Sequence, residues 1–151
     1  MGRGILLPAG GSYSGGMKTE VLRRRLRQVL ARYPFIEAAY LFGSHAAGRA
    51  RPDSDVDVAV VGPRNELQAR KLDILADLTA EGLDRVDLVA LDGADPLLRF
   101  EAVHANCLVF ARPGFDHGQN FSRALREYFD FEPYLRIQRD AFKRRVFSGQ
   151  A

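Results

Sequence analysis

The sequence contains no tryptophan and a single cysteine, Cys107, among its 151 residues. One cysteine cannot form an intramolecular disulfide, which argues against a small secreted scaffold held by disulfides. No apolar run approaches the roughly 18 residues of a membrane-spanning helix. The apolar run near the beginning of the chain is too short and too rich in Gly and Pro for a secretory signal. Cys and His are never grouped at zinc-ligand spacing. We therefore expect a cytoplasmic protein without structural zinc.

The rest of the composition is typical of one globular domain. Hydrophobic residues make up 46% of the chain, enough to bury a core in a domain of this length. The net charge of +3 fits anionic ligands or partners but does not by itself indicate DNA binding. Residues 1–16 are dominated by Gly and small residues. We expect a flexible N-terminal extension there and a single domain over 17–151.

The spacing of apolar residues predicts an alternation of helices and strands. Strands are predicted over 36–42, 55–61, 85–91 and 107–111, and helices over 19–33, 65–83, 95–104, 119–129 and 133–147. The last two helices are separated because proline, at Pro133, favours the beginning of a helix over its interior. This order predicts an α/β (α+β) fold: one mixed sheet of about four strands, flanked by helices, with a helical C-terminus.

The stretch "LFGSHAAGRARPDSDVDVAVVG", from Leu41 to Gly62, concentrates the residues with chemical potential. Gly43 follows the first of two apolar strands directly, and a glycine there lets the backbone turn sharply and a bulky group approach. Ser44 then begins a predicted helix, where free backbone N–H groups favour an anion such as phosphate. A Gly-Ser pair alone is also typical of a simple turn.

Three aspartates accompany this turn. Asp55 and Asp57 lie two residues apart on a predicted strand, so both project to the same face. Carboxylates that close repel each other unless a cation lies between them, and oxygen ligands suit Mg²⁺ or Mn²⁺. Asp87, on another predicted strand, can supply a third carboxylate. The alternative is that all three are strand-end acids facing water; their combination with the Gly-Ser turn favours a metal site.

These motifs carry a resemblance to a known family. Gly43-Ser44, ten residues, then Asp55-Val56-Asp57 resembles the signature of the nucleotidyltransferase (DNA polymerase beta-like) superfamily, and Asp87 in "DRVDLVAL" matches its third carboxylate. The stretch "GSHAAGRARPDSDVDVAVV" and the later "REYFDFEPYL" are similar to the minimal nucleotidyltransferases, the MNT class. One departure is Ala47, where that class often has arginine.

The resemblance implies the roles of individual residues. Asp55, Asp57 and Asp87 would be catalytic and would ligate two Mg²⁺ ions. The nucleotide would bind to Gly43 and Ser44 through its phosphates. Two further residues are assigned to the nucleotide site: Arg49 and Ser54. Arg49 can substitute for the missing arginine, although exposure of Arg49 and Arg51 to solvent is an equal alternative.

The resemblance also implies an activity. Many MNT-class proteins, the MntA-like antitoxins, are encoded beside a HEPN-domain ribonuclease toxin and transfer AMP from ATP to a toxin tyrosine. The leading hypothesis is therefore an adenylyltransferase antitoxin, with Mg²⁺, ATP and a HEPN toxin as partners and no membrane. One alternative is nucleotide transfer to a small hydroxyl compound, although the chain has little room for the helical substrate domain of such enzymes. Another is an antitoxin that acts by binding alone. Direct nucleic-acid binding is less favoured.

Other residues receive simpler interpretations. Arg99 and His104 have the Arg-x4-His spacing of HEPN ribonucleases, but a surface histidine at a helix end is the expectation here. His45 follows Ser44 and could approach a phosphate, but it is expected to be exposed in its loop. The aromatic residues from Tyr128 to Tyr134 are expected to pack the last helices on the sheet, with part of them forming a partner surface.

Overall fold

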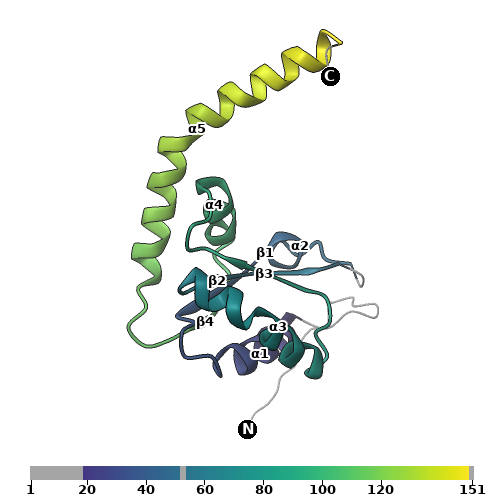
Figure 1. Cartoon of the computed structure of the whole chain (residues 1–151), viewed down its shortest axis with the longest axis vertical. Helices are drawn as coiled ribbons and strands as arrows, with labels where there is room; N and C mark the ends of the chain where they lie inside the picture. The colour runs from purple at the N-terminus through teal and green to yellow at the C-terminus, as the bar shows by residue number, and fades with distance from the viewer. Residues whose placement is uncertain (1–18, 52–53, 150–151) are drawn as a thin grey trace.

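A four-stranded mixed sheet lies at the centre of the computed structural model, which describes residues 19–51 and 54–149 (Figure 1). The extension expected over 1–16 lies outside these residues. The strand order is β3-β2-β1-β4. β1 is antiparallel to β2 and β4, whereas β2 and β3 are parallel. The strands span Ala38–Phe42 (β1), Val56–Val61 (β2), Val86–Ala90 (β3) and Leu108–Ala111 (β4). The expected mixed sheet is confirmed.

Helices cover both faces of this sheet. α1 and α3 lie on one side and α4 on the other, and α5 packs on α4 before it extends away from the sheet (Figure 1). None of the helices in the described part of the chain combines the length and apolarity needed to cross a membrane. The helices span Thr19–Leu30 (α1), Gly43–Ala46 (α2), Arg64–Ala80 (α3), Pro96–His104 (α4) and His117–Phe147 (α5).

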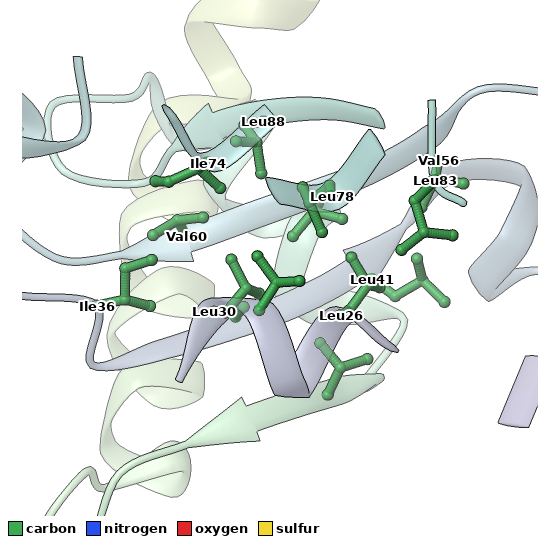
Figure 2. Packing of buried hydrophobic residues seen from close by; sticks show 14 of the residues in the cluster. Leu26, Leu30, Ile36, Leu41, Val56, Val60, Ile74, Leu78, Leu83 and Leu88 are labelled. Carbon is green, nitrogen blue, oxygen red and sulfur yellow. The ribbon is translucent and has the colours of Figure 1, made fainter. Parts of the chain in front are cut away.

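The alternation of apolar residues in β2 builds the larger core cluster. Val56, Val58 and Val60 point toward α1 and α3 and are buried, as their spacing predicts. Leucines of both helices and Ile74 of α3 close over them (Figure 2). Burying one such side chain contributes about 1.5–3 kcal/mol. The opposite face of the sheet is also buried, because α4 and α5 cover Tyr40 and Ala59.

α5 corrects the prediction of two helices separated near Pro133. One helix runs from His117 to Phe147 with Pro133 inside it. A proline removes one backbone donor and crowds the preceding turn, which can bend a helix without ending it. Figure 1 shows such a bend in the middle of α5. The pair between Glu132 and Arg136, with 2.7 Å between Oε1 and Nη2, spans the turn that follows the proline.

A partly buried hydrogen-bond network anchors the beginning of α5 to the sheet. The Tyr40 hydroxyl and His117 Nδ1 share a hydrogen bond of 2.7 Å, and Asn120 Nδ2 donates to the same hydroxyl at 3.1 Å. His117 Nε2 lies 2.8 Å from Asn106 Oδ1. Burial raises the pKa of Tyr40, so the hydroxyl stays protonated. The base of α5 is therefore held to β1 by polar contacts as well as by packing.

α4 provides the second anchor of α5. The guanidinium of Arg99 pairs with the Glu127 carboxylate, and the Phe100 and Tyr128 rings stack with centroids 4.2 Å apart. Tyr128 thus packs on α4, whereas Phe129 and Tyr134 are exposed. The expectation that most of the aromatic segment packs on the sheet is wrong, because α5 extends away from the sheet beyond α4. His104 ends α4 and is exposed, as the interpretation of a surface histidine predicts.

Candidate active site

Two of the three predicted aspartates lie side by side at one end of the sheet. Asp57 of β2 is the direct register partner of Asp87 of β3, and on its other side it faces Phe42, the last residue of β1. Asp57 is half-buried, whereas Asp87 is exposed. Parallel pairing of β2 with β3 brings these carboxylates together, and the chain turns into α2 beside them.

Gly43 lies against the Asp57 carboxylate. Its φ of +73° is in the left-handed region that glycine tolerates best. A Cβ at this position would lie 2.2 Å from Asp57 Oδ2, which is too close for two non-bonded atoms. The turn between β1 and α2 is therefore closed over Asp57 only because residue 43 is glycine. Ser44 follows, half-buried, and its carbonyl accepts a hydrogen bond of 2.9 Å from the Arg49 N–H.

The environment of Asp57 disfavours its charged form. Partial burial raises the pKa of this carboxyl, and the negative charges of Asp87 and Asp55 raise it further. His45 acts in the opposite direction and lowers the pKa of Asp57. Near neutral pH the site thus holds like charges close together at a free-energy cost, and a bound cation would offset that cost.

Asp55 takes a different position from the other two acids. It lies just before β2, and its Oδ1 is 3.3 Å from Nε of Arg85, with both side chains more than half exposed. In the residues that the structure describes, no three Asp, Glu, His or Cys side chains are arranged to hold a metal ion. An exposed ion pair such as that of Asp55 with Arg85 contributes about 0–1 kcal/mol to stability. If Asp55 left Arg85 to bind a divalent cation, the loss of this ion pair would therefore cost little free energy.

The donor set fits a hard divalent cation in its chemistry. Asp57 and Asp87 offer carboxylate oxygens from adjacent strands, and Asp55 is close enough for its charge to act on Asp57. Mg²⁺ is typically bound by one or two carboxylates together with substrate phosphates and water. The residues present can thus hold such an ion, with Asp55 reoriented.

His45 corrects the expectation of an exposed loop histidine. It belongs to α2 and is half-buried, and its Nε2 is a buried side-chain atom without a hydrogen-bond partner among the described residues. Its charge acts on Asp57, so it belongs to the site. Its position directly after Gly43-Ser44 is the only sequence signal that would have indicated this role.

The loop that follows α2 holds the remaining predicted residues. Arg49 and Arg51 are exposed, and the Ser54 hydroxyl oxygen accepts a hydrogen bond of 2.8 Å from the Arg51 N–H. Ser54 therefore shapes the loop, and Arg49 lies on its solvent side. Residues 52 and 53 lie outside the described part of the chain.

A cleft of about 560 Å³ opens beside Asp87. Its floor is β3, and Arg64 and Lys71 of α3 add positive charge to its wall. A second cleft, of about 630 Å³, is lined by Glu37, before β1, and by Asp92, after β3. It therefore lies at the opposite end of the sheet from Asp57, and the first cleft is the one that adjoins the acids.

Residues 24–113, which include the Gly-Ser turn and all three aspartates, match the polymerase beta nucleotidyltransferase family. This match covers more than half of the chain. The chain belongs to this nucleotidyltransferase family. The resemblance found in the sequence is thereby confirmed, and so is the expectation of a nucleotidyltransferase enzyme.

Solved structures agree with this fold. A chain of a toxin–antitoxin crystal structure with AMP-PNP is 21% identical with a TM-score of 0.59, covering 87% of this chain and 99% of that chain. A chain from the complex of tri-AMPylated Shewanella oneidensis HEPN toxin with MNT antitoxin is 19% identical with a TM-score of 0.59, covering 86% and 99%. A chain of a mutant MntA-HpeT toxin–antitoxin structure is 25% identical with a TM-score of 0.57, covering 87% of this chain and 98% of that chain. No curated protein gives a significant match.

Proposed function

We propose that this nucleotidyltransferase is a Mg²⁺-dependent antitoxin that transfers AMP from ATP to a tyrosine of a cognate HEPN-domain toxin and so neutralises it. The observation that carries the proposal is the half-buried Asp57, which lies beside Asp87 and under the glycine turn at Gly43. The similar structures that contain AMP-PNP or a tri-AMPylated HEPN toxin support the choice of nucleotide and acceptor. A cytoplasmic location belongs to the same proposal.

The acids would act together at the α-phosphorus of ATP. Bound Mg²⁺ supplies positive charge that stabilises the entering and leaving oxygens of an in-line displacement. Asp55, Asp57 and Asp87 would hold it, and Asp87, next to the cleft, would accept the proton of the attacking hydroxyl. A phosphorus–oxygen bond to the acceptor forms as the bond to the departing pyrophosphate breaks.

The turn after β1 would hold the triphosphate. Gly43 lets the phosphates approach the backbone, and the Ser44 hydroxyl and free N–H groups can donate to them. Arg49 would add positive charge to this side of the site. Ser54 would keep the basic loop in place through its hydrogen bond with the Arg51 backbone.

An antitoxin that acts by binding alone is the second candidate. One observation favours it: Asp55 pairs with Arg85 instead of turning toward the other two acids. In this case the aspartates would have no effect on neutralisation, and only the contact with the toxin would matter.

Transfer of label from α-labelled ATP separates the two candidates. The purified chain is incubated with Mg²⁺ and the HEPN-domain toxin encoded beside it, and compared with the variant Asp55→Asn/Asp57→Asn. We expect label on the toxin only with the intact acids, and unchanged transfer by Asp73→Asn, a matched substitution on the exposed face of α3. Inhibition of the toxin by both versions without any label would establish the binding-only candidate.

A further inference from the structure

The far half of α5 exposes an unusual amount of apolar surface. Among the residues that the structure describes, seven large hydrophobic side chains are exposed. One of them, Leu72, is on α3. Residues 129–147, called the arm below, extend away from the sheet (Figure 1). The other six all lie on the arm: Phe129, Tyr134, Ile137, Phe142, Val146 and Phe147, which are 49–85% exposed.

These side chains do not form a single stripe along the helix. Tyr134 and Ile137 are three residues apart and share one face, and Phe142 and Val146 are four apart and share another. Five residues separate Ile137 from Phe142, which rotates one face from the other by about 140°. A helix that lies on a membrane has one apolar and one polar face. A helix that is apolar on several sides is typically enclosed by protein.

The arm is also basic. Its 19 residues contain five basic residues and three acids, a net charge of 5 − 3 = +2. Glu132 pairs with Arg136 and Arg139, at 2.7 and 3.9 Å. A second copy of this chain would bring two such basic segments together, which like-charge repulsion disfavours. The charge therefore favours an acidic partner. Toward the end of the arm three cations have no ion-pair partner among the described residues: Lys143, Arg144 and Arg145.

The exposed area is large enough for a stable complex. Six large side chains at these exposures present on the order of 700–800 Å², close to the roughly 800 Å² that each partner contributes to a standard interface. The base of α5 is held by the Tyr40–His117 hydrogen bond and by the pair of Arg99 with Glu127. The arm is thus a preformed helix that a partner can bind without first ordering it.

We infer that the arm is the docking element for the partner protein, which encloses it with an apolar groove rimmed by acidic residues. For the identity of that partner, the toxin, this inference rests on the proposed function. The arm lies on a different element from Asp57 and Asp87. Binding and chemistry therefore depend on separate residues of the chain.

The substitution Phe142→Ser/Val146→Ser tests this inference on the full chain. Both side chains are exposed, so the fold should remain, and Leu72→Ser removes a hydrophobic side chain that is 81% exposed but lies outside the arm. With the HEPN-domain toxin as the probe, we expect the arm variant to raise Kd at least about tenfold and the control to leave it unchanged. In label transfer, KM should rise by a similar factor with kcat preserved at saturating toxin.

Charge reversal gives an independent test. Lys143→Glu/Arg144→Glu should also raise Kd for the toxin, and added salt should weaken wild-type binding more than binding of this variant. Circular dichroism before and after each substitution checks that α5 remains helical.

Several outcomes would overturn the inference. They are wild-type affinity in both arm variants, or a toxin that does not bind the wild-type chain. Arm-dependent binding to phosphatidylglycerol vesicles or to single-stranded RNA in place of the toxin would also overturn it, as would arm-dependent dimerisation in sedimentation. Failure of the proposed function differs from all of these: the toxin would bind through the arm, but no label would be transferred to it.

Discussion

Two regions of the molecule are each unfavourable for stability, in opposite ways: the end of the sheet with Asp57 and Asp87, called the acid end below, and the arm of α5. At the acid end, Asp57 is half-buried beside Asp87, so that like charges repel in a partly desolvated place. Along the arm, large apolar side chains are left in water. A domain selected for stability alone would have neither feature. The first would be relieved by a cation and the second by a protein surface, so each cost indicates a different missing component.

Asp57→Asn should give the largest effect on the acid end. Removing one charge takes away a proposed metal ligand, and we expect label transfer to fall by about a thousandfold or more. The same change removes repulsion with Asp87 and Asp55, so the melting temperature should stay the same or rise. Calorimetry and label transfer measure the two quantities on one sample. A large fall in melting temperature would contradict the electrostatic interpretation.

Gly43→Ala should damage both the fold and the activity. The added Cβ would lie 2.2 Å from Asp57 Oδ2, so either the turn or the carboxylate must move. The left-handed backbone adds a cost on the order of 1–2 kcal/mol. Gly48→Ala is the matched control, because its φ is +74° but no atom lies within 4 Å of the added Cβ. We expect equal backbone strain in both variants and loss of label transfer in Gly43→Ala alone. If the two variants transfer label equally well, the close contact of residue 43 with Asp57 has no role in activity.

Phe142→Ser/Val146→Ser should leave the acid end untouched. Exposed apolar residues contribute little to folding, so the melting temperature should change by no more than that of Leu72→Ser. Combining the arm substitutions with Asp57→Asn should add a binding defect to a chemical defect without further loss of stability, since the two regions are independent. Differential scanning calorimetry on the four proteins tests this, and non-additive melting temperatures would show that the regions are coupled.

The pH dependence of stability should give the smallest effect. The pKa of Asp57 is raised in the fold, so the folded state binds more protons than the unfolded state between pH 3.8 and that raised pKa. Without divalent ions, the free energy of unfolding should therefore fall as pH rises through this window. Mg²⁺ should restore stability above the window and do little below it. Asp57→Asn should flatten both the pH dependence of the free energy of unfolding and its response to Mg²⁺. If the variant keeps the wild-type pH profile, other groups cause the effect.

Local signals in the sequence predicted several elements well. Asp95 before Pro96 predicts the beginning of α4, and the Asp95 side chain accepts a hydrogen bond of 2.9 Å from the Leu98 N–H. The alternation of Val56, Val58 and Val60 predicts both the strand and its buried face. These features depend on neighbours within a few residues, so the sequence contains the necessary information.

Other features were not decided by the local sequence pattern alone. The continuity of α5 across Pro133 was mispredicted because a bend or a break depends on whether the preceding turn can deform. The burial of His45 was mispredicted because only packing around α2 decides it. The arginines of α1 give a further example, because Arg23 and Arg27 donate to the Leu108 and Val109 carbonyls of the edge strand β4, at 3.1 and 3.2 Å.

The sequence by itself determined the chemistry available: a Gly-Ser turn, three aspartates and a basic, aromatic C-terminal segment. Only the tertiary structure decided their arrangement. The parallel register of β2 and β3 brings Asp57 beside Asp87, and the closure of the turn puts Gly43 against the Asp57 carboxylate. The end of α4 leaves the arm uncovered. Strand order and helix contacts join residues distant along the chain, and no local pattern encodes which of them will meet.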